Sequence, residues 1–232
     1  MTPETISSPA RTGSDTIARI LAAAEALFAE HGFDAAPMSA IAERAGVSKA
    51  NIFHHFSSKN ALYRAVLRHA IREVTRQLKH MSSHSGAVSA DLAQFARGHL
   101  SSILEHDQFA RLMLREILSD MPQERLKIAQ QVFGENFSEL VTILRRGQES
   151  GELRADVDPA MVAIMLVGAD VFFFQANKVF RHFPEVNFAD DPALYSHQAV
   201  DILLRGILTP AAVKTPTRAG NSGTPSSAQH KE

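Results

Sequence analysis

The chain has 232 residues, of which 45% are hydrophobic and 21% charged, and its formal net charge is −1. These proportions are ordinary for a soluble globular protein. The near-zero net charge argues against a protein that coats nucleic acid non-specifically through its overall charge. Cysteine is absent, which excludes disulfides, thiolate chemistry and cysteine metal sites. The N-terminus has no basic-then-apolar leader, and the most apolar run, 160–171, is too short to span a bilayer. A cytoplasmic protein with no membrane partner is therefore predicted.

The N-terminal segment 1–14 is rich in Thr, Ser and Pro, and it is predicted to be a flexible arm with Arg11 available to a phosphate. A first helix is predicted over 15–31, because its apolar residues recur on one helical face. These residues are Ile17, Ile20, Leu21, Ala24, Leu27 and Phe28. Gly32 ends this helix, and Phe33 is expected to anchor the segment onto the helices that follow.

The stretch 37–59 predicts two short helices joined by a sharp turn. One apolar helical face precedes the turn, formed by Met38, Ile41, Ala42 and Ala45. Gly46 can then take the left-handed conformation that ends a helix, and the hydroxyl of Ser48 can cap the next one. With the first helix this makes a three-helix bundle, which is marginal alone and is expected to lean on the rest of the chain.

The third helix is predicted to face inward through Ile52 and Phe56, which lie four residues apart. The opposite side carries Ala50 and His54, with Asn51 and Phe53 beside them. A short helix with an anchored inner face and a small, polar and aromatic outer face suits insertion into a DNA major groove.

Charge supports a DNA contact in this region. The segment 44–72 has no carboxylate and carries the cations Arg44, Lys49, Lys59, Arg64, Arg68 and Arg72. Phosphate contacts require such a basic patch. The alternative is that the helix-turn-helix only packs and that these cations are merely solvated.

The rest of the chain is also predicted to be helical. A fourth helix is expected from Lys59 to about Ser83, as one rigid rod that connects the DNA surface to the second half. Further helices are predicted at 89–104, 108–120, 123–150, 159–182 and 192–209. The sequence therefore predicts an all-α fold of about nine helices, and the polar tail 211–232 is expected to be disordered.

The residues from Ile20 to Leu67 resemble the TetR family of transcriptional regulators. The segments that carry this resemblance are LFAEHGFDAAPMSAIAERAGVSKANIFHHFSSK and ALYRAVL. The later phrase GQESGELRADVDP also looks family-like. The resemblance implies a DNA-binding domain at 15–60 and a helical effector-binding and dimerisation domain at 61–210.

The resemblance also implies particular DNA contacts. Base or nearby phosphate contacts are implied for Lys49, Ala50, Asn51, Phe53 and His55, and backbone contacts for Ser39 and Lys59. Ser48 and His54 are two further candidates. The helical wheel favours His54 as the outward residue, whereas the family pattern favours His55. Two of these residues depart from the family. A small residue or threonine is more typical at the position of Asn51, and a tyrosine is more typical at the position of Phe53. Losing that tyrosine hydroxyl leaves an apolar contact, for example with a thymine methyl.

The segment 159–182 is apolar nearly all round, with MVAIMLVGADVFFF at its centre. The last helix adds Leu194, Val200, Leu203, Leu204, Ile207 and Leu208. In the family two such helices per subunit form a four-helix dimer interface, and a monomer would leave part of this surface wet. Two-fold symmetry would then require a roughly palindromic operator, with half-sites about 34–36 Å apart.

Several polar residues interrupt apolar helical stripes in the second half, which suggests a cavity for a small effector. The candidate ligand-binding residues are Phe95, His99, Phe109, Met113, Glu116, Phe133, Asn136 and Phe137. They fit a large apolar cavity with a few polar anchors, suited to an apolar or aromatic molecule. For each polar residue taken alone, and for Asp170, Gln175 and Asn177 on the later helix, a partner side chain in the core or interface is favoured over a ligand contact.

No catalytic motif, cofactor motif or convincing metal site is found. His80 and His84 have a spacing that can hold a metal, but a third ligand is not evident. The sequence therefore predicts a homodimeric, ligand-responsive repressor without a cofactor. A constitutive or activating regulator with no effector is the alternative, and an enzyme on a helical scaffold has no motif in its favour.

Overall fold

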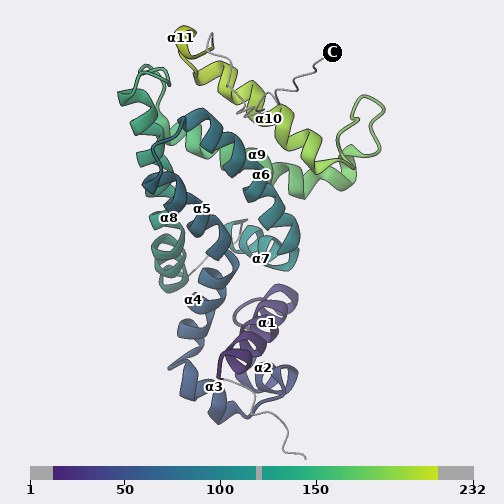
Figure 1. The fold of residues 1–232 in the computed structure, drawn as a ribbon. Coiled ribbons are helices and arrows are strands. Elements are labelled where there is room, and N and C mark those ends of the chain that lie inside the picture. The colour runs from purple at the N-terminus through teal and green to yellow at the C-terminus, as the bar shows by residue number, and fades with distance from the viewer. Residues whose placement is uncertain (1–12, 119–121, 214–232) are drawn as a thin grey trace, which may run out of the picture.

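The computed structural model describes residues 13–118 and 122–213, with the backbone alone at 115–118 and at 213. Within these ranges the fold is all-α, as predicted (Figure 1). The helices are α1 (Gly13–His31), α2 (Met38–Ala45), α3 (Lys49–His55), α4 (Lys59–Ala70), α5 (Arg72–Ser83), α6 (Val88–Glu105), α7 (Asp107–Leu118), α8 (Gln123–Glu149), α9 (Pro159–Phe180), α10 (Pro192–Ile207) and α11 (Pro210–Val213). We call α1–α4 the head and α5–α11 the body. Arg11 and the tail from 214 onward lie outside the described residues.

Local backbone chemistry produces the turn between α2 and α3. Gly46 has φ 64° and ψ 40°, the left-handed conformation that ends a helix. Its N–H donates to the carbonyl of Glu43 at 3.0 Å, and the N–H of Val47 donates to that of Ala42 at 3.0 Å. The Ser48 hydroxyl then accepts the N–H of Asn51 at 3.1 Å, which caps α3. The helix-turn-helix prediction is thus confirmed in detail.

The predicted fourth helix differs from the structure, because it is interrupted at Ile71 and forms two helices, α4 and α5. Ile71 has φ −94° and ψ 6°, and its carbonyl accepts the Thr75 hydroxyl at 3.0 Å. The residues on either side are apolar with helical spacing, so nothing local in the sequence marks the break. Its reason is tertiary: α4 buries its face in one apolar cluster and α5 in another.

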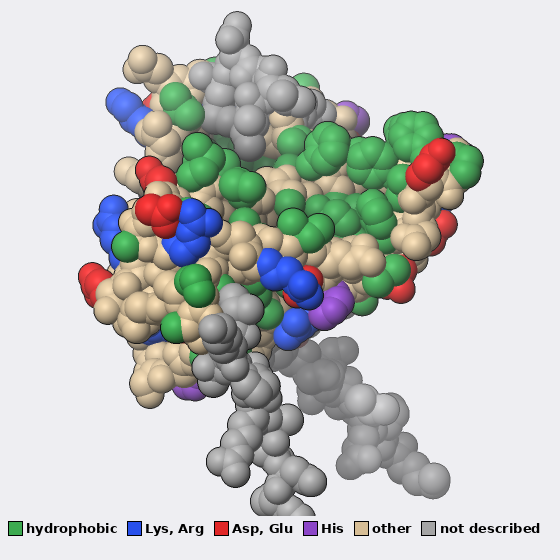
Figure 2. Space-filling model, turned by 90° about the horizontal axis from the view of Figure 1, so that it is seen from above, with side chains coloured by type: hydrophobic (Ala, Val, Ile, Leu, Met, Phe, Trp, Pro, Cys, Tyr) green, Lys and Arg blue, Asp and Glu red, His purple; other side chains and the backbone are tan. Residues whose placement is uncertain are grey.

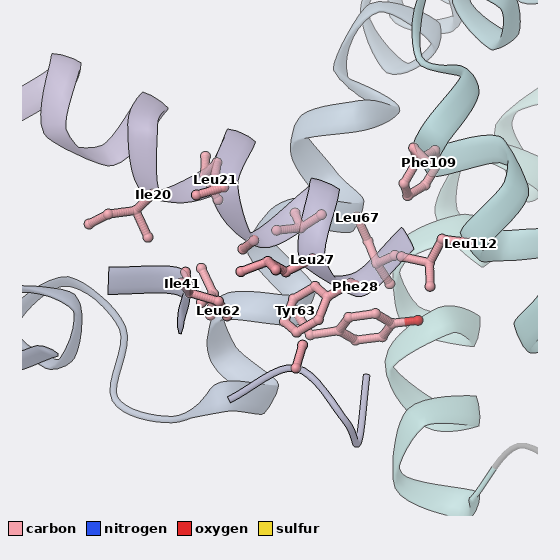
Figure 3. Close-up of a cluster of buried hydrophobic side chains, with 14 of the residues drawn as sticks. Ile20, Leu21, Leu27, Phe28, Ile41, Leu62, Tyr63, Leu67, Phe109 and Leu112 are labelled. Atoms are coloured by element: carbon pink, nitrogen blue, oxygen red, sulfur yellow. The ribbon is translucent and has the colours of Figure 1, made fainter. Parts of the chain in front are cut away.

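The first apolar cluster does not stop at the head. It combines α1–α4 with Phe109, Leu112 and Met113 of α7 and with Ile128 and Val132 of α8. Figure 3 shows side chains of α7 lying beside those of α1 and α4. The three-helix bundle therefore completes its core with residues of the body, as its small size led us to expect.

Helix α9 corrects an expectation about the apolar run 160–171. The whole helix has 22 residues and a mean hydropathy of 1.7 over its most apolar window, so it is long and apolar enough to cross a membrane. One such helix is weak evidence, because core helices of soluble proteins pass the same test. Asp170 lies within it and is paired with a side chain of α6, which fits packing against protein.

Candidate functional site

The face of α3 opposite Ile52 is open to solvent. Ile52 is fully buried, whereas the Phe53 ring is 44% exposed, an unusual position for a large apolar side chain. Ser39, Ser48, Lys49, Ala50 and His54 are also exposed, and Asn51, His55 and Lys59 are half-buried. The Oδ1 atom of Asn51 is buried without a hydrogen-bond partner. The predicted DNA-contacting residues thus gather around one exposed helix, and their contacts with bases or phosphates stay a prediction.

Lys59 has a second role that the sequence did not indicate. Its Nζ donates to the carbonyl of Asp34 at 3.2 Å and lies 4.7 Å from the centroid of the Phe33 ring. On α8, Arg125 makes matching contacts: its Nη1 donates to Asp34 Oδ2 at 2.7 Å, and its guanidinium carbon lies 5.1 Å from the same ring. Partial burial lowers the pKa of Lys59. Lys59 therefore also helps to fix the loop between α1 and α2 against the body.

We expect Lys59→Met to weaken binding to operator and random DNA alike, by about tenfold, and to make the slope of affinity against salt shallower by about 1. The methionine keeps most of the apolar stem of the side chain but removes the charge that we expect to meet a phosphate. Binding titrations at several salt concentrations measure both effects. The matched control is Lys127→Met, on an exposed position of α8. An unchanged salt slope in Lys59→Met would contradict a phosphate contact.

A cavity of about 340 Å³ lies in the body. Seven of the predicted ligand residues line it: Phe95, His99, Phe109, Met113, Phe133, Asn136 and Phe137. The side chain of the eighth, Glu116, lies outside the described residues. The lining also includes residues that sequence patterns did not single out, among them Ile71, Val74, Ser102, His106, Val171 and Phe174. A mostly apolar cavity of this size is typical of a small-molecule site.

His99 is the principal polar group of the cavity wall. Its Nδ1 lies 2.8 Å from Oδ2 of Asp170 on α9, and both side chains are buried. The Phe95 ring stacks on the imidazole at 5.6 Å. Burial raises the pKa of Asp170, and the hydrogen bond from His99 opposes this shift. Since Nδ1 is held by the carboxylate, Nε2 is the nitrogen of His99 that can serve a ligand.

Two further polar side chains near the cavity bind protein atoms. Asn136 Nδ2 donates to the Thr75 hydroxyl at 3.0 Å, which links α8 to α5. The Tyr195 hydroxyl donates to the carbonyl of Ala169 at 2.6 Å. Burial raises the pKa of Tyr195 to about 12, and the charge of Asp170 adds to this. Three of the polar residues that interrupt the apolar stripes, His99, Asn136 and Asp170, thus have partners inside the protein.

The cavity and the head share structural residues. Phe109 and Met113 of α7 line the cavity and are also buried in the apolar cluster of the head. Ala70, at the end of α4, belongs to both sets as well. A molecule that changed the packing of α7 would therefore also displace side chains that pack against α1 and α4.

One face of α9 is apolar and exposed. Figure 2, which looks onto the α9–α10 end of the molecule, shows hydrophobic side chains gathered over this face. The large hydrophobic residues that are exposed on α9 are Met161, Ile164, Met165, Phe172 and Val179, and Phe183 and Ile202 are also exposed. Monomeric soluble proteins rarely expose apolar surface on this scale, so it indicates a protein interface. Among the described residues, no group of three or more His, Cys, Asp or Glu side chains is placed to hold a metal ion.

Comparison with protein families decides the class of protein. A model described as "Bacterial regulatory proteins, tetR family" matches residues 20–66, and one described as "Tetracyclin repressor-like, C-terminal domain" matches residues 89–202. The chain belongs to the TetR family. This confirms the predicted family, that of the bacterial regulatory proteins related to the tetracycline repressor.

Relatives and solved structures agree with this TetR-family assignment. The chain is 36% identical to the transcriptional regulator RutR of Escherichia coli over 103 residues, 44% of this chain and 48% of RutR, so the match spans about half of that relative. It is 29% identical to UidR of the same organism over 71% of this chain and 79% of UidR. SmeT, a multidrug efflux pump repressor of Stenotrophomonas maltophilia, has a TM-score of 0.64 at 22% identity, over 91% of this chain and 100% of SmeT. FadR of Bacillus subtilis, in complex with stearoyl-CoA, has a TM-score of 0.66 at 20% identity, over 82% and 98%. These two structures share the fold.

Proposed function

We propose that this TetR-family protein is a cytoplasmic, homodimeric repressor that a small apolar or aromatic molecule releases from a palindromic operator. The observation that carries the proposal is the cavity whose wall residues Phe109 and Met113 also belong to the core of the head. An effector that prefers one packing of α7 can shift the position of the head, by as much as its affinities for the two states differ.

The dimer is proposed to form through α9 and α10. The exposed apolar stripe on α9 supports this pairing, because water contact with Ile164 and Phe172 is unfavourable in a monomer. Two-fold symmetry would place the two copies of α3 on successive major grooves, about 34–36 Å apart. Base contacts are proposed for Lys49, Asn51, Phe53 and His55, and phosphate contacts for Ser39 and Lys59.

The effector is proposed to be largely apolar with at least one hydrogen-bonding group. The aromatic and aliphatic lining of the cavity supports the first property, and the Nε2 atom of His99 supports the second. The pair with Asp170 fixes the imidazole ring, so that Nε2 is presented without further loss of side-chain freedom.

Two experiments test the proposal. Selection of bound sequences from random DNA yields the operator and its half-site spacing together, and a palindrome with half-sites one helical turn apart is expected. Aromatic compounds and fatty acids are then screened for stabilisation of the protein and for release of that operator. Compounds that stabilise the protein without releasing DNA, or the absence of any stabilising compound, would favour the constitutive or activating regulator.

Filling the cavity gives an independent check. We expect Val171→Trp to bind the operator within about threefold of the wild type, to raise thermal stability modestly, and to lose the response to effector. Val171 lines the cavity from α9, so the indole occupies the effector's space without a change in α3. Operator titrations with and without effector measure this. A variant that is still released at the wild-type effector concentration would argue that the effector binds elsewhere.

A further inference from the structure

We infer that the effector carries a phosphate-bearing head group on its apolar part, and that this head binds outside the cavity, in a basic groove on α4, α5 and α8. The inference rests on the proposed effector cavity and specifies what the molecule bound there looks like. The basic groove is lined by Arg68, Ile71, Arg72, Thr75, Arg76, Lys79, Val132, Glu135 and Asn136.

The basic groove adjoins the apolar cavity. Ile71 and Asn136 line both spaces, so the two are separated by the thickness of these side chains. In this wall between the cavity and the groove, Asn136 donates a hydrogen bond to the Thr75 hydroxyl at 3.0 Å. The helix break at Ile71 lies at the same point. A hydrocarbon chain that passed between Ile71 and Asn136 and displaced this hydrogen bond would connect the cavity with the groove.

The cations of the groove are available to an anion. Arg68, Arg72 and Lys79 are exposed, and within the described residues none of them has an ion pair with a carboxylate. Arg76 differs, because its Nε donates to Glu73 at 2.9 Å, which lowers the pKa of that carboxyl to about 2. Like charges at helical spacings repel each other, and a bound phosphate would relieve this repulsion.

The sequence placed Arg68 and Arg72 in the basic patch expected to contact DNA, but their position along α4 and α5 favours a different role. Arg72 lies thirteen residues beyond Lys59 along α4 and α5, which places it about 20 Å further from the helix end that adjoins α3, at 1.5 Å per residue. A duplex seated on the exposed face of α3 would leave the basic groove free. The groove's position beside the cavity, rather than beside α3, points to the effector.

The ligand chemistry that fits both spaces is an amphiphile with a hydrocarbon chain and a phosphate. The cavity takes the chain, and the guanidinium groups of Arg68 and Arg72 can bind phosphate oxygens in pairs. In simple alkyl phosphates the phosphate is bonded directly to the chain, whereas in acyl-CoA thioesters the pantetheine arm lies between the two. Chains of equal length with different heads therefore separate the contribution of the head from that of the chain.

The test measures the affinities of four compounds with twelve-carbon chains, namely dodecanol, laurate, dodecyl phosphate and lauroyl-CoA, for the full-length protein. The variant is Arg72→Glu/Lys79→Glu, and the matched control is Arg97→Glu/Arg145→Glu, which makes the same charge change at exposed positions outside the cavity and the groove. Dodecanol binding and circular dichroism report whether each variant is folded. If the glutamate variant does not fold, Arg72→Gln/Lys79→Gln replaces it.

We expect at least one of the phosphate compounds to bind the wild type tightest, and Arg72→Glu/Lys79→Glu to lose that affinity by about tenfold or more. Dodecanol affinity should stay within about twofold, since its head carries no charge. Tightest binding by lauroyl-CoA or by dodecyl phosphate identifies which source of phosphate the groove prefers. Equal affinity for dodecanol and both phosphate compounds, or an equal loss in the control, would overturn the inference.

The two proposals can fail separately. If dodecanol or laurate releases the operator as well as the phosphate compounds do, the head site is wrong and the effector cavity stands. If none of the four binds, the head site is overturned, and the proposed function then depends on the aromatic compounds in the screen. If a phosphate compound binds through Arg72 and Lys79 but leaves the operator bound, the site stands and the effector role fails.

Discussion

Ile164→Glu/Phe172→Glu is expected to convert the proposed dimer to monomers and to lower operator affinity by about a thousandfold, the advantage that two linked heads have over one. The two side chains are 57% and 64% exposed on α9. In a two-fold interface each substitution occurs twice, so four carboxylates would be buried close together without partners. Light scattering after gel filtration measures the mass, and operator titrations measure the affinity.

Leu126→Glu is the control for this variant, because Leu126 is 44% exposed but lies on α8, at the head end of the body. It should leave the molecular mass unchanged. A wild type that is already monomeric at micromolar concentration, or a dimeric Ile164→Glu/Phe172→Glu, would show that α9 is not the interface.

Asp170→Ala should lower the free energy of unfolding by about 3 kcal/mol, the scale seen when one partner of a buried pair is removed. The substitution takes away the acceptor that holds His99 Nδ1 at 2.8 Å and leaves a void between α6 and α9. Chemical denaturation measures the loss. Tyr195→Phe serves as a control, since it removes one neighbouring hydrogen bond and should cost only about 1 kcal/mol.

The pH dependence of the same site follows from burial. The folded state raises the pKa of Asp170, so it holds this proton more tightly than the unfolded chain does. The stability contributed by the group is therefore fully present below its unfolded pKa, near 3.8, and is lost as the pH rises through the raised value in the folded state. Relative to Asp170→Asn, the wild type should lose stability across that window. A relative gain would mean that the hydrogen bond from His99 outweighs burial.

Short-range chemistry explains why the head could be predicted so closely. The left-handed Gly46, the cap at Ser48 and the inward Ile52 each act within a few residues, so the sequence carries the whole signal. The stripes of α6, α7 and α8 likewise indicated which residues face the cavity, because helical spacing alone places Phe95 with His99.

Contacts between distant segments explain what could not be predicted. The break at Ile71 reflects two apolar clusters that only the folded chain creates. Arg125 meets Phe33 and Asp34 across 91 residues, and nothing in the spacing of these residues signals the contact. The sequence pattern identified the polar residues on apolar stripes but not their partners. For example, it did not show that His99 pairs with Asp170. The domain boundaries and the roles of the site residues stay predictions.

The shared core of the head and the body has a consequence for how this protein can change over generations. Leu112 and Met113 help to complete the core around Phe28 and Tyr63, and Met113 also faces the cavity. If the cavity binds the proposed effector, a substitution in α7 that adapts the protein to a new effector therefore also alters the support of the helix-turn-helix. Effector preference and operator binding would then be unable to drift independently.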